Sequence, residues 1–223
     1  MKKIVTVKRR ALAANEERAE TLRAGFAASG TLVANLISSP GSGKTTLLEA
    51  TVRTLDGELS CAVLEGDVAT ERDADRIRAL GVPAHQILTG GACHLDARLV
   101  ESGLSDGGMP EVDILFIENV GNLICPTTYD LGEDFKVVLL SVAEGDDKPV
   151  KYPAIFSRAE VAVITKSDLL PYVPFDLEAV QDQISSLNPD GTILVTSSLA
   201  GDGVDGWIEL LKTRLEAKRR AHG

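Results

Sequence analysis

The segment ISSPGSGKTTLLEA, residues 37–50, constrains the fold of this chain more than any other feature. It follows an apolar, β-rich run and opens an amphipathic stretch, which predicts a strand, a glycine-rich turn and a helix in succession. Gly43, Lys44 and Thr45 match the end of the pattern G-x-x-x-x-G-K-[ST], and Ser38 occupies its first glycine position. The backbone N–H groups of such a turn and of the helix N-terminus can face an anion. An ordinary turn with an exposed lysine is the alternative, and the strand–turn–helix context favours a phosphate-binding loop.

The same loop predicts how the phosphates of a nucleotide would be held. Lys44 is expected to reach the β- and γ-phosphates, and the Thr45 hydroxyl is expected to hold Mg²⁺. The residues expected to bind the phosphates are Gly41, Ser42, Gly43, Lys44, Thr45 and Thr46.

Short apolar runs rich in β-branched residues alternate with helical patterns along the rest of the chain. The expected strands are 31–38, 60–67, 113–120, 136–142, 160–168 and 192–198, with a weaker candidate at 82–88. The expected helices are 44–56, 70–80, 93–104, 176–187 and 203–219, with a further helix at 11–28. This alternation predicts an α/β fold: a mostly parallel twisted sheet of about seven strands with helices on both faces, as in P-loop NTPases. Ligands bind beyond the carboxyl ends of the strands in such sheets, so the residues there matter most.

Acidic residues end two of the expected strands. Glu118 follows DILFI, where a Walker-B acid would stand, and Gly121 follows it closely, so that its N–H could sense a γ-phosphate. Asp67 ends another strand and is a second candidate for binding Mg²⁺ or placing water. The alternative for either acid is a helix N-cap or a solvated loop carboxylate.

The end of the strand expected at 160–168 predicts which base is bound. Lys166 and Asp168, preceded by Thr165, match the [NT]-K-x-D signature for guanine. A carboxylate at Asp168 can accept hydrogen bonds from two guanine N–H groups that adenine does not present together, while the Lys166 stem covers the base. Ser198 and Leu199 follow the next strand, where a loop would back the base. A surface turn with a stray lysine and aspartate is the alternative.

A cysteine and a histidine, Cys93 and His94, stand side by side after two glycines at the expected start of a helix. Thiolate and imidazole suit Zn²⁺ and Ni²⁺, and Cys125, just beyond Gly121, is the expected third ligand. Because a tetrahedral site usually has four ligands, the fourth could be water or come from a second chain across a two-fold axis. Buried cysteine packing as a small hydrophobe remains an alternative, as we expect for Cys61.

Composition narrows the class of protein. A formal net charge of −10 argues against broad binding of nucleic acid or anionic membranes. Three cysteines without a close pair do not form a disulfide framework, and neither a secretory apolar region nor a spanning apolar run is seen, so we expect a cytoplasmic protein. The 223 residues suit one domain with an extension: residues 1–30, whose helix packs on the domain, and residues 31–223, a P-loop GTPase domain carrying the metal site.

The assembled motifs resemble the HypB family of GTPases, of the SIMIBI class, which help to insert nickel during the maturation of [NiFe] hydrogenase. The motifs that carry the resemblance are SSPGSGKTTLLE, EGDVATERDADRI, TGGACHLDARLV, IENVGNLICP, DKPVKYP and TKSDLLPYV. The resemblance implies Ni²⁺ or Zn²⁺ bound by Cys93, His94 and Cys125 at a homodimer interface promoted by GTP. It also implies two partners, the companion chaperone HypA and the hydrogenase large subunit precursor, and a contact to nucleotide or partner from Lys148 or Lys151. MKKIVTVKRR lacks the Cys-rich or His-rich stretch of some members.

The sequence thus predicts a slow, regulatory GTPase that converts GTP to GDP and phosphate, with Lys44, Asp67 and Glu118 as catalytic residues. GTP and GDP would shift the segment after Glu118, move Cys125 and so control nickel release. The alternatives are a urease nickel chaperone of the UreG type, an ATP-dependent small-molecule kinase on the same fold, and a binding module in which metal is only structural.

Overall fold

Seven strands form one parallel sheet in the computed structural model, which describes residues 2–67 and 72–222. The order of the strands across the sheet is β3-β2-β4-β1-β5-β6-β7, and every neighbouring pair is parallel. The predicted parallel α/β fold is therefore confirmed. The strands are β1 (Leu32–Ser38), β2 (Cys61–Asp67), β3 (Ala84–Leu88), β4 (Ile114–Glu118), β5 (Phe135–Ser141), β6 (Val161–Thr165) and β7 (Thr192–Val195).

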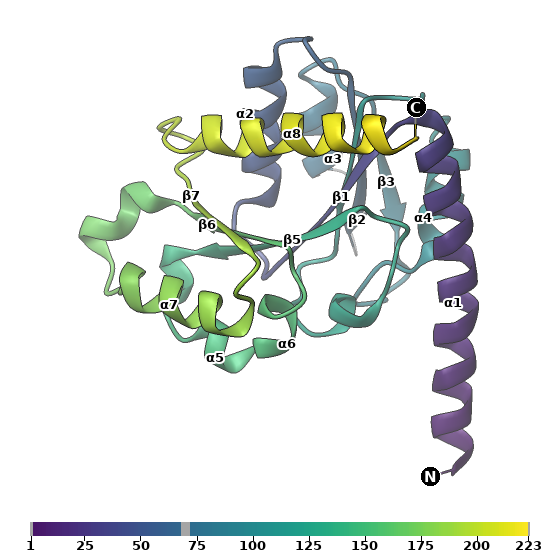
Figure 1. The fold of residues 1–223 in the computed structure, drawn as a ribbon, viewed down its shortest axis with the longest axis horizontal. Helices are drawn as coiled ribbons and strands as arrows, with labels where there is room; N and C mark the ends of the chain where they lie inside the picture. Colours follow the sequence, from purple (N-terminus) through teal and green to yellow (C-terminus); the bar gives the residue numbers. More distant parts are fainter. Residues whose placement is uncertain (1, 68–71, 223) are drawn as a thin grey trace.

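Helices cover both faces of the sheet (Figure 1). Helices α2 and α8 pack on one face of the sheet. On the opposite face, α1 and α4 cover one end of the sheet, and α6 and α7 cover the second end. Alternate residues of β1 show the division, because Leu36 faces the first core and Ile37 the second. The helices are α1 (Lys2–Ser29), α2 (Lys44–Leu55), α3 (Arg72–Arg78), α4 (Ala97–Asp106), α5 (Lys148–Lys151), α6 (Pro153–Phe156), α7 (Leu177–Leu187) and α8 (Val204–His222), with short 3₁₀ turns η1 (Cys125–Thr128), η2 (Val142–Glu144) and η3 (Ser167–Tyr172).

Several predicted boundaries differ from the structure. The strand expected at 192–198 ends at Val195, and the helix expected at 11–28 begins at Lys2. For two other boundaries, the physical reason is visible at the carboxyl edge of the sheet. The strand expected to run to residue 168 stops at Thr165, because Lys166 adopts a left-handed conformation with φ 59°. The helix expected at 93–104 begins only at Ala97, where the Asp96 carboxylate caps it by accepting from the Leu99 N–H at 2.8 Å. Cys93 and His94 therefore lie in the loop before α4.

Helix α1 lies along one side of the domain, beside α4, and extends beyond it (Figure 1). Ala19 and Phe26 are buried at its interface with the domain, and the Arg23 guanidinium pairs with both Asp130 carboxylate oxygens at 2.6 and 2.7 Å. The division of the chain at residue 30 stays a prediction.

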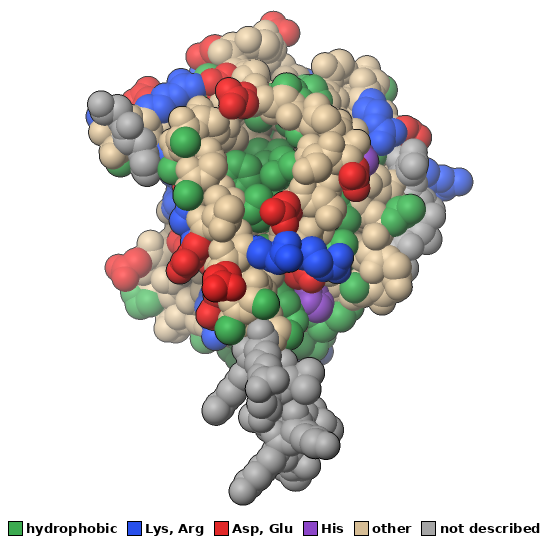
Figure 2. All heavy atoms as spheres, turned by 90° about the vertical axis from the view of Figure 1, so that its right-hand side faces the viewer, with side chains coloured by type: hydrophobic (Ala, Val, Ile, Leu, Met, Phe, Trp, Pro, Cys, Tyr) green, Lys and Arg blue, Asp and Glu red, His purple; other side chains and the backbone are tan. Residues whose placement is uncertain are grey.

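The surface bears charges of both signs. On the face seen in Figure 2, acidic and basic side chains lie next to one another around a hollow with a hydrophobic floor. None of the helices in the described part of the chain is long and apolar enough to cross a membrane.

Candidate nucleotide and metal sites

The loop between β1 and α2 has the backbone geometry of an anion cradle. Gly41 and Gly43 adopt positive φ angles of 76° and 92°, which only glycine reaches without strain. Helix α2 begins at Lys44 with Gly43 as its N-cap, and no side chain caps it. The first N–H groups of the helix therefore lack a side-chain acceptor, and an anion can take that place.

Lys44 and Thr45 point from this helix start to the end of β4. The buried Lys44 ammonium donates to the Ser38 hydroxyl at 2.9 Å and lies 3.9 Å from a carboxylate oxygen of Glu118. The Thr45 hydroxyl is 3.1 and 3.2 Å from the two Glu118 oxygens. Burial raises the pKa of Glu118 to about 7, with the positive charge of Lys44 opposing that rise.

Sequence reasoning missed two acids beside Glu118. Glu65 lies opposite Glu118 in the parallel pairing of β2 and β4, and Asp73 approaches from α3. One carboxylate oxygen from each of the three acids lies within 4.8 Å of the others. Glu65 is 2% exposed, and burial, reinforced by the Glu118 charge, raises its pKa to about 8. The signal that could have identified Glu65 is its spacing of two from Asp67, which puts both on one face of the strand.

Five of the six predicted phosphate-binding residues line one cavity of about 420 Å³ together with the acids. The exception is Ser42, which is fully buried and whose hydroxyl donates to the Ser39 carbonyl and to Glu144. Asp67 lines it from the end of β2, and Gly121 lines it from the segment after β4. Gly121 lies so close to the phosphate loop that a Cβ there would be 2.8 Å from Pro40 Cγ and 3.0 Å from its backbone nitrogen. Arg76, which was not predicted, lies at the rim and pairs with Glu49 and Asp73 at 2.9 and 3.0 Å.

The residues predicted to bind a base line a second cavity, of about 280 Å³. It shares Gly43, Thr46 and Lys166 with the first cavity, so the two are adjacent; its remaining lining includes Asp168, Ser198 and Leu199. The Lys166 ammonium donates to the Gly41 carbonyl at 2.7 Å, which holds its stem across the loop. Asp168 is fixed by the Ser197 hydroxyl, which donates to it at 2.5 Å.

Cys93, His94 and Cys125 come together from two loops. One possible ligand atom of each lies within 4.8 Å of the other two, and Cys93 Sγ is 3.6 Å from His94 Nδ1. The His94 ring packs on Tyr129 with ring centroids 4.0 Å apart. Desolvation lowers the pKa of His94 and so favours the neutral imidazole that binds metals, whereas a hydrogen bond with Cys125 raises the pKa of the Cys93 thiol.

Two asparagines that sequence reasoning also missed connect these loops to the end of β4. The Asn119 side-chain oxygen accepts from the Leu95 N–H at 3.1 Å. The Asn122 amide donates to the Cys93 carbonyl at 3.3 Å, and its oxygen accepts from the Cys125 N–H at 3.3 Å. The segment 118–125 therefore contacts the phosphate cavity at one end and the Cys–His cluster at the other.

The two lysines left open by the sequence have different surroundings. Lys148 lies 3.9 Å from Glu144, and Glu144 accepts a hydrogen bond from Ser42 of the phosphate loop. Lys151 is exposed and pairs with Asp147. Lys148 is thus the one tied to the phosphate loop.

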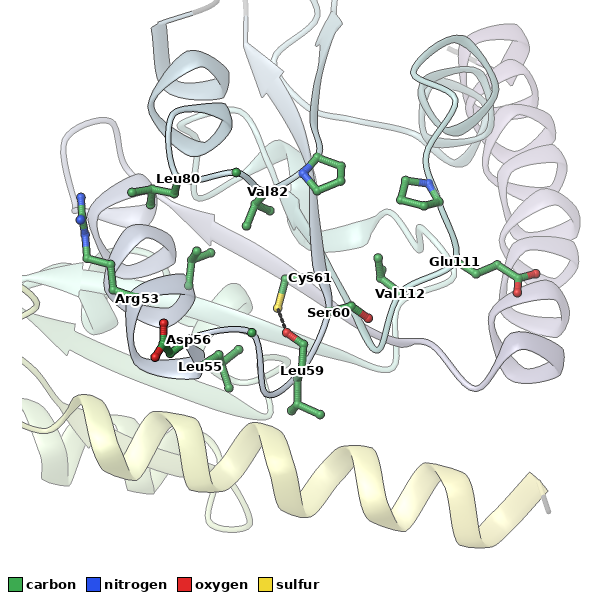
Figure 3. Close-up of a pocket in the computed structure, with 15 residues that line it drawn as sticks. Arg53, Leu55, Asp56, Leu59, Ser60, Cys61, Leu80, Val82, Glu111 and Val112 are labelled. Carbon is green, nitrogen blue, oxygen red and sulfur yellow. Dashed lines mark hydrogen bonds between the residues drawn. The ribbon is translucent and has the colours of Figure 1, made fainter.

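A larger cavity, of about 680 Å³, opens at the opposite, amino edge of the sheet (Figure 3). Cys61 lines it at the start of β2, with its thiol 3.8 Å from the Leu59 carbonyl. Burial raises the pKa of this thiol to about 12, so it stays protonated. The cavity and Cys61 lie apart from the nucleotide and Cys–His residues.

Comparison with known proteins identifies close relatives by both sequence and structure. The CobW/HypB/UreG nucleotide-binding domain matches residues 32–195. The chain is 50% identical over 200 residues to the hydrogenase maturation factor HypB of Escherichia coli K12, covering 90% of this chain and 69% of that protein. The crystal structure of HypB from Archaeoglobus fulgidus matches with a TM-score of 0.86 at 40% identity, covering 92% of this chain and all of that one. The crystal structure of HypB from Helicobacter pylori in complex with nickel matches with a TM-score of 0.84 at 41% identity, covering 94% of this chain and 97% of that one.

Proposed function

Because the chain belongs to the HypB family of hydrogenase maturation factors, we propose that it is a GTP-hydrolysing metallochaperone that binds nickel or zinc and assists nickel insertion into [NiFe] hydrogenase. The observation that carries the proposal is the segment 118–125, which contacts the phosphate cavity at one end and the Cys–His cluster at the other. A cytoplasmic setting and the division into residues 1–30 and 31–223 belong to the same proposal.

The nucleotide part of the proposal assigns GTP to the two adjacent cavities. Phosphates occupy the cavity at the start of α2, and guanine occupies the cavity at Asp168, whose carboxylate is already aligned by Ser197. Lys44 and the loop N–H groups stabilise charge on the transferring phosphoryl group. Asp67 and Glu118 orient the attacking water.

The oxygen ligands next to Thr45 suit Mg²⁺. The Thr45 hydroxyl and the Glu118 carboxylate supply hard oxygen donors, and Asp67 lines the same cavity. One buried oxygen of Glu65, which lines the same cavity, has no hydrogen-bond partner among the described residues. This oxygen is therefore free to accept a hydrogen bond from a water molecule bound to Mg²⁺. When bound, Mg²⁺ supplies charge neutralisation at the β- and γ-phosphate oxygens.

The metal cargo is assigned to Cys93, His94 and Cys125. Thiolates and imidazole match the preference of Ni²⁺ and Zn²⁺ for sulfur and nitrogen ligands. One chain brings three such side chains together, so a second copy across a two-fold axis can complete the coordination. Cys93 is exposed, as a ligand at a homodimer interface must be before assembly. The client is the hydrogenase large subunit precursor, and a HypA-like chaperone is the companion.

The nucleotide state controls the metal through the backbone after Glu118. Gly121 rests on Pro40 of the phosphate loop, so a γ-phosphate that moves this loop displaces Gly121 as well. Asn122, the next residue, holds the backbones of both Cys93 and Cys125. We expect slow hydrolysis, since a slow step keeps the GTP-bound arrangement of this segment populated long enough to act as a switch.

The test is Ni²⁺ affinity, measured by chelator competition with GDP and with a non-hydrolysable GTP analogue. We expect different affinities in the two nucleotide states, and loss of tight binding in Cys93→Ala. Cys61→Ala is the matched control, because this buried cysteine lies outside the cluster. Equal affinity and stoichiometry in both states would refute the coupling, and wild-type affinity in Cys93→Ala would refute the metal site. Sedimentation under the same conditions tests the homodimer.

A further inference from the structure

Helix α1 reaches both metal-bearing loops through one buried side chain, that of Asn15, which is 7% exposed. Its side-chain oxygen accepts from the Ala97 N–H at 2.8 Å. Its amide nitrogen donates to the Asp130 carbonyl at 2.8 Å. Ala97 is the first residue of α4, directly after the loop of Cys93 and His94, and Asp130 follows the turn that begins at Cys125.

The two hydrogen bonds of Asn15 therefore fix the distance between two separate loops. The loop before α4 supplies Cys93 and His94, and the β4–β5 connection supplies Cys125. An additional contact joins the same pieces, since His94 packs on Tyr129, the neighbour of Asp130. Any change in how Asn15 holds Ala97 and Asp130 alters the separation of the ligands.

Helix α1 is itself firmly docked where it meets the second loop. Arg23 forms two hydrogen bonds with the Asp130 carboxylate. Gly132 allows the helix backbone to approach closely, because a Cβ at this position would lie 2.9 Å from the Ala19 carbonyl oxygen. The helix thus provides a stable reference from which Asn15 holds the loop of Cys93 and His94.

We propose that Asn15 is a positioning residue for the Cys–His cluster, and that the affinity of the cluster for a soft divalent cation depends on the placement of α1. This inference rests on the proposed metal site. Asn119 and Asn122 hold the same loops from the nucleotide side, so α1 supplies a second control that does not pass through GTP. A contact that shifts α1 changes metal affinity while nucleotide affinity stays the same.

Asn15→Ala and Asn15→Asp test the proposal in the full chain. The alanine variant removes both hydrogen bonds. The aspartate variant keeps an acceptor for the Ala97 N–H and nearly the same volume, but it places an acceptor against the Asp130 carbonyl. Arg18→Ala is the matched control, since its ion pair with Glu101 of α4 is about half exposed and so contributes little to the docking of α1. Among the described residues, Arg18 forms no hydrogen bond with either ligand loop.

The probe is Ni²⁺ alone, followed by chelator competition and by the near-ultraviolet charge-transfer absorption of nickel thiolates. Loss of groups that orient metal ligands costs about 10–100-fold in affinity. Because Asn15 acts through backbone, we expect about tenfold weaker binding and a shifted absorption band in Asn15→Ala, with a smaller change in Asn15→Asp. GTP affinity in the Asn15 variants, and nickel affinity and spectrum in Arg18→Ala, stay within about twofold of wild type, which corresponds to about 0.4 kcal/mol.

Wild-type nickel affinity and spectrum in either Asn15 variant would overturn the proposal, as would an equal loss in Arg18→Ala. Asn15→Asp decides the question if the alanine variant does not fold, with the urea unfolding midpoint reporting its folded state. Cys93→Ala separates the two levels of inference. If that variant binds nickel as wild type does, the proposed metal site itself fails, whatever Asn15 does.

Discussion

The carboxylate of Glu118 makes the stability of the nucleotide-free protein depend on pH in an unusual direction. Burial at the end of β4 raises its pKa from an ordinary 4.5 to about 7, despite the nearby Lys44 ammonium. Between these values the folded protein retains a proton that the unfolded chain releases. The contribution of Glu118 to the free energy of unfolding therefore falls as pH rises from about 4.5 to about 7 and levels off above that.

The magnitude follows from the two pKa values. Their difference, at about 1.4 kcal/mol per pH unit, corresponds to a loss of about 3 kcal/mol from this one group. Glu65, with a pKa raised to about 8 by burial and by Glu118, changes stability in the same direction and extends the window upward. The partners of Asp113 and Asp130 lower the pKa values of these carboxyls, so their contribution to stability rises with pH in the acid range. The contribution of Glu118 must therefore be isolated by comparing the wild type with a variant that lacks only this carboxylate.

Glu118→Gln is such a variant, because the amide keeps the size of the side chain and cannot ionise. Urea unfolding of both proteins from about pH 5 to 8.5, with EDTA and without nucleotide, gives the free energy of unfolding at each pH. As pH rises across this range, we expect the free energy of unfolding of Glu118→Gln to increase relative to that of the wild type by about 2–3 kcal/mol. Glu209→Gln, an exposed carboxylate on α8, should follow the wild-type curve. A difference between wild type and Glu118→Gln that is constant with pH, or of opposite sign, would refute the reasoning.

Three further predictions follow from single contacts. Asp168→Asn should weaken GTP binding by about 10–100-fold and reduce the preference over ATP, because a charged acceptor is lost; thermal shifts with each nucleotide measure it. Gly121→Ala should destabilise the protein by about 1–3 kcal/mol and weaken GTP binding, since the new Cβ would lie 2.8 Å from Pro40; unchanged stability and affinity would contradict the close approach. Trp207→Phe should cost about 1–3 kcal/mol in urea unfolding, because the buried indole N–H donates to Thr51 at 2.9 Å; a neutral result would contradict that role.

The parallel sheet could be predicted because its signals are local. Apolar runs alternating with helical patterns, and a glycine-rich turn between the first pair, require only neighbouring residues to be interpreted. The boundaries at Lys166 and Ala97 were missed because each depends on a backbone angle or a capping hydrogen bond that apolar periodicity does not report.

Part of the candidate site could be predicted in the same way. Lys44, Glu118 and Asp168 stand at strand or helix ends with recognisable spacing, and the structure places them around two adjacent cavities. Glu65 was missed because it lies inside a strand, and its proximity to Glu118 appears only when β2 pairs with β4.

The sequence by itself determined the order of strands and helices, the phosphate loop and the residue types available to bind base and metal, because these are properties of short segments. Only the tertiary structure decided which segments meet. The pairing of β4 with β2 joined Glu65 to Glu118, and the docking of α1 brought Asn15 between the loops of Cys93 and Cys125. Such contacts join residues far apart in the chain and are fixed by packing over the whole sheet, so no local pattern contains them.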